Sequence, residues 1–522
     1  MDLTDQQSQI LQQFSTGFDM KINAFAGTGK TTMLKLLVEN NAKKKFLVLV
    51  FNKSVQQELA KKFPANAFVA TIHSFAYRNV KEILHLGMIG SEKQLIPYIV
   101  KTYHIPYDVA QFCVNILIEY FNSKEKFINA KSVNHLIQDN EQLLIFYKEH
   151  SGELQASLIL KILNETFQNM IEWKRSMTHW GYLKYFQLHL DDFSSSFNYD
   201  VVMLDEGQDT NYVSLDIFEN MNGQKVIVGD THQGIYGWRG AINAMKTLDY
   251  STFYLSNSFR INNYTANLWD HILKNFKAEN QTLKAYFSWG GTWNHKQCII
   301  FRSNAWLIRY IQELDEYEQI NLTRNIKDIF EMALSLNKVK QYYLTWNKAY
   351  LNTLEERIKM IVEQNKTKQE FAYYITEVLD DYELITNWNL IEKIDINTVY
   401  QKAYQHFDDT SLSYLSTAHT VKWLEFDTVE ISDDFQDIFK TLYKNFILKR
   451  KRKIKQVKEV FYDQKKNATI SSMRAIVEEV NLMYVAVTRA IKNLTIKSSA
   501  IQRILNTSES QFEEELAKES KK

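Results

Sequence analysis

The stretch AFAGTGKTT, Ala24 to Thr32, decides the fold of this 522-residue chain. It follows a short apolar run, Lys21 to Ala26, that is typical of a buried strand, and an apolar helical pattern begins at about Thr31. Gly27 and Gly29 permit a tight turn whose backbone N–H groups can surround phosphate oxygens at the positive end of the helix. The usual pattern begins with glycine where this loop has alanine, which is small enough for the turn. We therefore predict a phosphate-binding loop.

The same loop carries side chains suited to a nucleoside triphosphate. Lys30 can bring a positive charge to the β- and γ-phosphates, and the Thr31 hydroxyl can bind Mg²⁺. We therefore predict ATP and Mg²⁺ as cofactors. The predicted ATP-binding residues of the loop are Ala26, Gly27, Thr28, Gly29, Lys30, Thr31 and Thr32.

A second motif, VVMLDEGQDT, spans Val201 to Thr210. Its four apolar residues predict a strand that places two carboxylates at its carboxyl end. Asp205 can hold Mg²⁺, and Glu206 can accept a proton from an attacking water. Alone, this motif could equally be an acidic loop that caps a helix. The phosphate-binding loop upstream favours the catalytic interpretation.

A third motif, VIVGDTHQGIYGWRGA, spans Val226 to Ala241. Gln233 follows a strand at the sheet edge where α/β proteins bind ligands, and its amide can sense a γ-phosphate by hydrogen bonding. Tyr236, Trp238 and Arg239 alternate aromatic and basic character, which suits stacking on the bases of a single strand. Aromatic residues considered alone are more often part of a core.

The order of these motifs resembles that of the UvrD/Rep/PcrA-type superfamily 1 helicases, and the resemblance extends over nearly the whole chain. The forms of several motifs are similar to those of the F-box DNA helicases and their bacterial and phage relatives. The further matching segments are LVFNKSVQQEL (49–59), ATIHSFAYR (70–78), LSNSFR (255–260), STAHTVKWLEFDTVEISDDF (416–435) and NLMYVAVTRA (481–490).

The resemblance implies roles for residues outside the three motifs. Gln7, in LTDQQ, stands where the family reads adenine, and Phe259 can stack on that base. Arg260 and Arg489 would reach the γ-phosphate from a second domain, with Glu425 near the ribose. The predicted catalytic residues are therefore Lys30, Asp205, Glu206, Gln233, Arg260 and Arg489, with Thr31 and Asp205 as metal ligands.

The resemblance also implies a DNA partner, either single-stranded DNA or a junction of single and double strands. The predicted DNA contacts are Phe51, Asn52, Thr71, His73, Tyr236, Trp238, Arg239 and His419. The basic run KRKRKIK, Lys449 to Lys455, could contact phosphates or could be a solvated charged helix.

The chain departs from the family pattern at a few positions. Trp423 stands where the family usually has glycine, and Thr420 stands where a basic residue is frequent. The segment between Arg260 and Ser416 is shorter than in larger relatives, which predicts a reduced accessory domain and weaker duplex unwinding. Because the motifs run from Gln7 to Ala490, we expect neither an F-box nor an added nuclease domain in this sequence.

The predicted fold class is α/β, with two RecA-like P-loop NTPase domains built on parallel sheets and mainly helical insertions. The first domain comprises residues 1–78 and 191–248 with a helical insertion at 79–190, and the second comprises 249–314 and 396–507 with a reduced helical insertion at 315–395, before a charged, frayed tail at 508–522. Strands are predicted at 21–26, 46–51, 68–72, 201–204, 226–228, 298–301, 414–416, 428–431 and 494–497.

Composition is that of an ordinary globular protein, with 45% hydrophobic and 24% charged residues. The net charge of +1 does not by itself point to nucleic acid, although a groove can be locally basic. The polar N-terminus is no signal peptide and no apolar run is long enough to span a membrane, so we expect a cytoplasmic protein. The two cysteines, Cys113 and Cys298, fit no metal pattern and are expected to be reduced thiols.

The sequence therefore predicts an ATP-dependent DNA helicase or translocase that moves 3′ to 5′ on single-stranded DNA. One alternative is an ATPase motor subunit of a larger repair, recombination-control or phage-defence complex, with little unwinding of its own. Another is a DNA-binding module with an inactive ATP site. The intact set of predicted catalytic residues argues against the inactive module.

Overall fold

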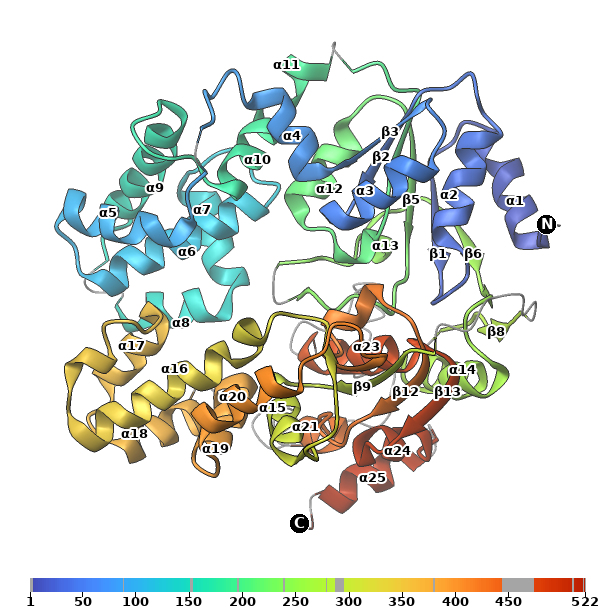
Figure 1. Ribbon diagram of the computed structural model, residues 1–522. Coiled ribbons are helices and arrows are strands. Elements are labelled where there is room, and N and C mark those ends of the chain that lie inside the picture. Colours follow the sequence, from blue (N-terminus) through green and yellow to red (C-terminus); the bar gives the residue numbers. More distant parts are fainter. Residues whose placement is uncertain are drawn as a thin grey trace. The chain divides into compact units, whose positions relative to one another are not determined.

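The computed structural model describes residues 3–87, 89–150, 154–194, 197–237, 240–277, 279–286, 295–378, 381–443, 474–508, 511–519 and 521. The chain forms two compact units, Met1–Leu255 and Ser256–Lys522 (Figure 1). Each unit contains its own parallel sheet, which confirms the predicted α/β fold class.

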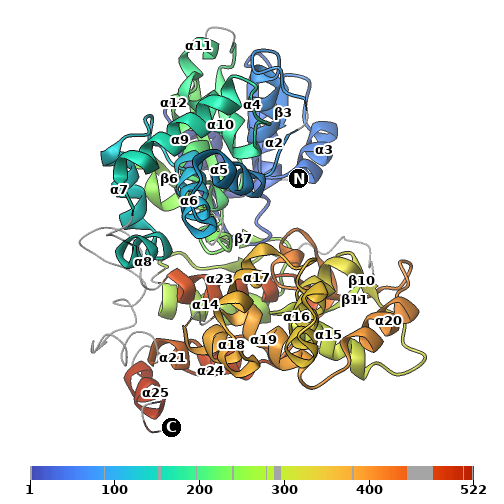
Figure 2. The ribbon, with the colours of Figure 1, turned by 90° about the vertical axis from the view of Figure 1, so that its left-hand side faces the viewer.

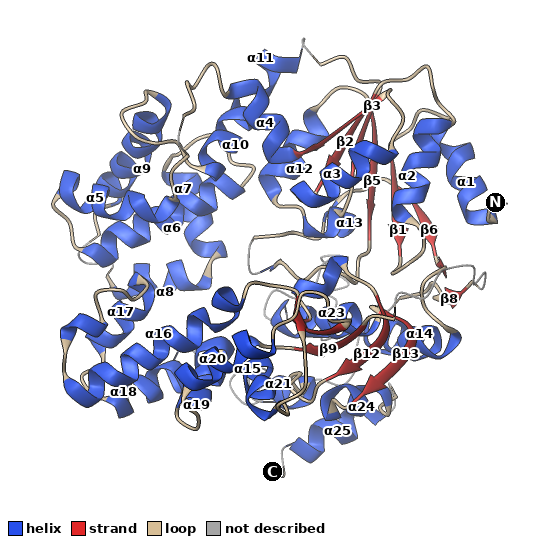
Figure 3. Cartoon of the chain, in the orientation of Figure 1, coloured by secondary structure: helices blue, strands red, loops and turns tan. Residues whose placement is uncertain are grey.

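Unit 1 is built on a six-stranded sheet in the order β3-β2-β4-β5-β1-β6, and all neighbouring strands are parallel. The strands are β1 (Met20–Ala24), β2 (Phe46–Val50), β3 (Ala67–Thr71), β4 (Val201–Leu204), β5 (Gln224–Gly229) and β6 (Ser251–Leu255). Every residue of β2, β4 and β5 is buried, as expected for central parallel strands covered on both faces. Figure 3 shows this set of strands in red with blue helices around it.

Because of the edge strand β6, unit 1 ends later in the chain than the predicted domain boundary. It pairs along its whole length with β1, from Met20↔Ser251 to Ala24↔Leu255, so unit 1 continues to Leu255 rather than ending at residue 248. The first two residues of β6 are exposed, so they do not need to be apolar. The strand accordingly lacks the continuous apolar run that marked its neighbours.

Helices connect the strands of unit 1 and form its insertion. The connecting helices are α1 (Asp5–Phe14), α2 (Lys30–Glu39), α3 (Lys53–Lys62), α4 (Ile72–Val80), α12 (Tyr212–Asn220) and α13 (Ala244–Thr247). The insertion is helical as predicted, with α5 (Leu95–Tyr103), α6 (Tyr107–Asn122), α7 (Ala130–Asp139), α8 (Glu141–Glu149), α9 (Ala156–Ile171), α10 (His179–Leu188) and α11 (Leu190–Ser194). One apolar cluster joins the insertion to the sheet, because Phe112 and Leu183 belong to the same buried core as Leu47.

Unit 2 contains a five-stranded parallel sheet in the order β10-β11-β9-β12-β13 and a small parallel pair, β7-β8. The strands are β7 (Asn257–Ser258), β8 (Lys284–Ala285), β9 (Gln297–Phe301), β10 (Asn321–Leu322), β11 (Ser413–Thr417), β12 (Phe426–Ile431) and β13 (Ala490–Ile496). All four strands predicted in this part of the chain are present.

The helices of unit 2 include a second insertion whose last helix lies wholly beyond the predicted end at residue 395. The insertion contains α16 (Ile326–Thr345), α17 (Glu356–Gln364), α18 (Lys368–Tyr373), α19 (Tyr382–Ile391) and α20 (Ile396–His406), which Figure 2 shows grouped beside α15 (Asn304–Glu313). The remaining helices are α14 (Asn263–Lys277), α21 (Ile438–Leu442), α23 (Arg474–Val487), α24 (Ser499–Leu505) and α25 (Phe512–Glu519).

The predicted frayed tail is a packed helix instead. Phe512 of α25 is fully buried, and its ring packs against that of Phe439 at a centroid distance of 5.6 Å and an interplanar angle of 50°. Arg503 donates to the carboxylates of Glu515 at 2.8 Å and Glu519 at 2.6 Å. Some of the charged side chains that suggested a solvated tail therefore bind Arg503 and hold α25 against α24.

Two further predictions concern membrane spans and the two cysteines. Among the helices that the structure describes, none has the length and apolar character needed to cross a membrane. Cys113 and Cys298 are both free and buried, and burial raises the pKa of each thiol.

Candidate nucleotide and DNA sites

The predicted phosphate-binding loop lies between the end of β1 and the start of α2. Gly27 and Gly29 have positive φ angles of 71° and 83°, a conformation that side chains rarely adopt. Gly29 is also the N-cap residue of α2 and provides no side-chain cap to its first turn. The Thr28 hydroxyl, which is buried, donates to the carbonyl of Phe25 at 2.8 Å and fixes the loop from within. The loop therefore has the backbone geometry that the sequence predicted.

Strand β4 delivers the two predicted catalytic carboxylates to the same edge of the sheet. Asp205 follows the strand and its N–H donates to the carbonyl of Leu49 at 2.9 Å. Glu206 has a positive φ of 55°, and its N–H donates to an oxygen of Asp205 at 2.9 Å. The Lys30 ammonium lies 3.4 Å from each oxygen of the Glu206 carboxylate. The first two motifs are thus in direct contact.

Asp205 lies in an environment that opposes its negative charge. Burial and the neighbouring Glu206 raise the pKa of the Asp205 carboxyl, whereas Lys30 lowers it. A divalent cation would favour the ionised form. Mg²⁺ is commonly held by one or two carboxylates together with substrate phosphates, so Asp205 with the Thr31 hydroxyl fits that donor set.

Gln233 lies in the loop after β5, where the third motif was predicted to bind phosphate. Its side chain is buried and its amide donates to the Asp230 carboxylate at 2.7 Å. The amide thus has a defined partner in this structure. Gln208 and Asp230 were not predicted as site residues, yet both are buried and join the second motif to the third through the 3.0 Å contact from Asp230 N–H to the Gln208 carbonyl.

Gln7 completes the N-terminal cap of α1. The Thr4 hydroxyl accepts the Gln7 N–H at 3.2 Å, and the Gln7 side-chain carbonyl accepts the Thr4 N–H at 3.0 Å. This capping box fixes the side chain that the resemblance assigns to adenine, and it leaves the amide N–H₂ group of Gln7 outside the cap.

Three residues of unit 2 that the resemblance places at the nucleotide take part in side-chain contacts. The Arg260 guanidinium forms an ion pair with the carboxylate of Glu425. Phe259, which is 41% exposed, contacts the ring of Tyr286 edge to face at 5.1 Å. An exposed aromatic ring beside a paired arginine is compatible with the predicted stacking on a base.

Arg489 is buried, and its guanidinium is hydrogen-bonded within unit 2. It donates to the carbonyls of Val485 at 2.9 Å and Lys422 at 2.5 Å, and to the Thr488 hydroxyl at 3.0 Å. In this structure the predicted second phosphate arginine therefore links α23 to the segment before Trp423. To bind the γ-phosphate as predicted, the guanidinium would have to exchange these hydrogen bonds for bonds to phosphate oxygens.

The unusual Trp423 ends the short helix η6 (Thr420–Trp423), which follows His419. The Lys422 ammonium lies 5.5 Å from the centre of the Trp423 ring, a distance typical of a cation–π contact. The Thr420 hydroxyl contacts that of Thr417 at 3.0 Å. The two departures from the family pattern are thus accommodated by local contacts.

Two of the predicted DNA contacts form one stacked pair in unit 1. The rings of Phe51 and Tyr236 are 5.5 Å apart with an interplanar angle of 12°, and Phe51 is 38% exposed. Trp238, Arg239 and the basic run Lys449 to Lys455 lie outside the described residues.

Asn52 and Thr71 cap helices at the carboxyl ends of neighbouring strands. The side-chain carbonyl of Asn52 accepts the N–H of Val55 at 2.9 Å, and the Thr71 hydroxyl accepts that of Ser74 at 3.0 Å. These bonds explain why such residue types follow β2 and β3. Their predicted contacts with DNA remain predictions.

His73 lies in α4 beside an aromatic cluster of the insertion. Its ring nitrogen is 3.2 Å from the Tyr182 hydroxyl, and its ring centre is 4.9 Å from that of Trp180. Burial, with a smaller effect of His179, lowers the pKa of His73 to about 4. At neutral pH this residue would therefore meet DNA as a neutral hydrogen-bonding group.

The lowered pKa of His73 predicts acid sensitivity. An unfolded histidine has a pKa of about 6.5, so between pH 6.5 and 4 the unfolded chain binds a proton that the folded chain does not. The contribution of His73 to stability is therefore greatest above pH 6.5, and it falls by about 2 kcal/mol as the pH falls from 7.5 to 5. Urea unfolding at the two pH values should show a smaller loss for His73→Asn than for the wild type. Equal losses would contradict the assignment.

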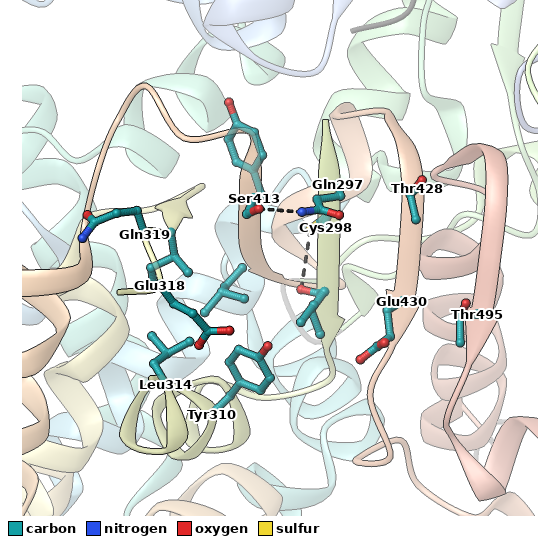
Figure 4. Close-up of a pocket in the computed structure, with 14 residues that line it drawn as sticks. Gln297, Cys298, Tyr310, Leu314, Glu318, Gln319, Ser413, Thr428, Glu430 and Thr495 are labelled. Carbon is teal, nitrogen blue, oxygen red and sulfur yellow. Dashed lines mark hydrogen bonds between the residues drawn. The ribbon is translucent and has the colours of Figure 1, made fainter. Parts of the chain in front are cut away.

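A separate cavity of about 430 Å³ lies in unit 2 against the amino-terminal halves of β9 and β11. Figure 4 shows Glu318 and Glu430 among its lining residues, with the side-chain amide of Gln297 donating to Ser413 at 2.6 Å. None of the predicted site residues lines it. Parallel sheets bind ligands at the carboxyl ends of their strands, and two carboxylates would repel a phosphate. The cavity is therefore a poor nucleotide site.

The strand–loop–helix unit with a glycine-rich loop, a contacting lysine and a buried carboxylate pair defines unit 1 as a P-loop nucleotide-binding domain. Residues 3–253 match the UvrD/REP helicase N-terminal domain family. This match and the relatives that follow confirm the resemblance to UvrD-like superfamily 1 helicases. The two parallel sheets correspond to the two RecA-like domains of UvrD-like helicases, the first within the matched residues and the second in unit 2.

Individual relatives extend the likeness beyond unit 1. The chain is 29% identical to F-box DNA helicase 1 of Gallus gallus, across 95% of this chain and 49% of that protein. It is 25% identical to F-box DNA helicase protein 1 of Schizosaccharomyces pombe, across 95% of this chain and 57% of that protein. A probable DNA helicase II homolog of Mycoplasma genitalium is 22% identical across 65% of this chain and 54% of its own length. The chain spans about half the length of these relatives.

Proposed function

We propose that this chain is an ATP-dependent DNA helicase or translocase that moves 3′ to 5′ on single-stranded DNA. The observation that carries the proposal is the contact of Lys30 with Glu206, because it brings the phosphate-binding loop and the carboxylate pair together at one sheet edge. The similar proteins are named as DNA helicases, and this supports assigning the chain to that class of enzyme.

The residues of unit 1 have distinct tasks in this proposal. Lys30 binds the β- and γ-phosphates, and Asp205 with Thr31 holds Mg²⁺. When bound, Mg²⁺ neutralises charge on the phosphate oxygens. Glu206 orients the attacking water and accepts its proton. Gln233 exchanges its bond to Asp230 for one to the γ-phosphate, which would report the nucleotide state to the following loop.

The steady-state rate of ATP hydrolysis, with and without single-stranded DNA, tests the proposal. Strong stimulation by DNA, absent from a Glu206→Gln control prepared in parallel, supports an ATP-driven DNA motor. Displacement of streptavidin from biotin at the 5′ end but not the 3′ end of an oligonucleotide would support the 3′ to 5′ direction. Equal stimulation by RNA would contradict the DNA assignment, and no hydrolysis under any condition would contradict the motor itself.

The stacked pair Phe51–Tyr236 should act as a base platform. Stacking of a base on an aromatic side chain contributes about 1–3 kcal/mol, so Phe51→Ala or Tyr236→Ala should weaken single-stranded DNA affinity about 5- to 150-fold. Fluorescence anisotropy of a labelled oligonucleotide measures this change. Phe127→Ala, which removes an aromatic ring that is 71% exposed in the insertion, is a matched control. A loss of similar size in the control would show that the pair has no special role.

A further inference from the structure

Gln208 is a buried amide directly beside the predicted catalytic carboxylate. It lies in the short helix η2 (Gly207–Asp209), and only 1% of it is exposed. Neither the sequence motifs nor the resemblance gave this side chain a role.

The contacts of Gln208 use both ends of its amide. The N–H₂ group donates to the carboxylate of Glu206 and, at 3.3 Å, to that of Asp209. The carbonyl oxygen accepts the N–H of Asp230 at 3.0 Å. A reversed amide would place its carbonyl against two carboxylates and its N–H₂ group against an N–H donor. The orientation of Gln208 is therefore fixed by its surroundings.

Two glycines allow this close arrangement. A side chain at Gly229 would place its Cβ 2.4 Å from the Gln208 carbonyl oxygen and 3.0 Å from the N atom of Gly207. A Cβ at Gly207 would lie 2.6 Å from the Ile227 side chain. The loop after β4 and the end of β5 thus approach each other closely enough for one amide to bridge them.

We propose that Gln208 is a positioning residue that holds the Glu206 carboxylate in place for the attacking water. The same side chain ties Glu206 to the loop of Asp230, whose carboxylate accepts the amide N–H of Gln233 at 2.7 Å. This inference rests on the proposed ATP hydrolysis. It adds a connection from the proton acceptor to the predicted phosphate sensor, made entirely within unit 1.

Two substitutions separate the donor from the acceptor function of Gln208. Gln208→Glu keeps an oxygen for the Asp230 N–H but removes the donor to Glu206, whereas Gln208→Leu removes both. Because small misplacements of a catalytic group can lower rates about 10²-fold, we expect kcat to fall about 10- to 100-fold in both variants. The KM for ATP should change less than about threefold, since the phosphate-binding loop is untouched.

The matched control is Gln187→Glu, because Gln187 is also a buried amide that donates to a carboxylate, that of Asp216 at 2.8 Å. It should cost stability but leave kcat and KM unchanged. A wild-type kcat in Gln208→Leu would show that the donor is not needed, and a raised KM with unchanged kcat would indicate nucleotide binding instead. Either result overturns the inference.

A second measurement does not depend on activity. If the wild type hydrolyses no ATP with DNA, the proposed function fails, but the contact can still be tested by urea unfolding of Glu206→Ala, Gln208→Ala and the double variant. Coupled side chains give non-additive changes in unfolding free energy. Additive changes would show that Gln208 does not hold Glu206.

Discussion

Replacing Arg260 with alanine is expected to lower kcat for DNA-stimulated ATP hydrolysis about 10³-fold, with little change in ATP affinity. Charge develops on the γ-phosphate oxygens in the transition state, and an arginine that meets them lowers the barrier more than it strengthens ground-state binding. Arg260 is suited to this role because its side chain is only 20% exposed and its guanidinium is already paired with Glu425.

The ion pair of Arg260 with Glu425 allows a structural explanation to be separated from a catalytic one. Glu425→Gln breaks the same ion pair but leaves the guanidinium in place. If Arg260 only stabilises the turn around Glu425, both substitutions should have similar effects. If Arg260 acts on phosphate and Glu425 lies near the ribose, the first should lower kcat and the second should mainly raise the KM for ATP.

Rapid-quench measurement of a single turnover, with binding of a fluorescent ATP analogue measured separately, distinguishes these outcomes. Arg309→Ala is a matched control in unit 2, because Arg309 pairs with Glu313 at 3.3 Å and 53% of its side chain is exposed. It should leave both parameters unchanged. An Arg260→Ala variant that keeps wild-type kcat would remove Arg260 from the catalytic set.

The strands of the sheets were largely predictable because parallel strands buried on both faces form short apolar runs. VVML corresponds residue for residue to β4, and FLVLVF to β2 with one residue more. β6 was missed because an edge strand needs no such run, and STFYL begins with two exposed residues. The two-residue strands β7, β8 and β10 are too short to leave a pattern.

The candidate site was predictable to the extent that its chemistry is local in sequence. The glycine-rich loop and the adjacent carboxylates each lie within one motif, so spacing alone located them. The Gln208 bridge, the Arg260–Glu425 ion pair and the burial of Arg489 depend on segments far apart in the chain. Such contacts arise from packing, which one sequence without relatives does not reveal.

Replacing Glu206 with glutamine is expected to lower kcat about 10²- to 10⁴-fold, the range for loss of a general base. Glutamine keeps the shape of the side chain and a carbonyl oxygen for the Gln208 amide, so the local hydrogen bonding can persist. It cannot accept the proton of the attacking water. It also removes the negative charge that lies 3.4 Å from the Lys30 ammonium, which frees Lys30 for phosphate.

ATP binding should therefore be unchanged or tighter in Glu206→Gln, and this combination distinguishes it from Asp205→Asn. Asp205 is the predicted Mg²⁺ ligand, so replacing its carboxylate with a neutral amide should raise the Mg²⁺ concentration needed for half-maximal ATP binding. Titrations of nucleotide at several Mg²⁺ concentrations measure this difference directly. If Glu206→Gln kept more than about a tenth of the wild-type kcat, a loss far below that of a general base, the proton would have to be accepted elsewhere. The paired carboxylates at the end of β4 would then both serve the metal, and the assignment of separate roles to them would be wrong.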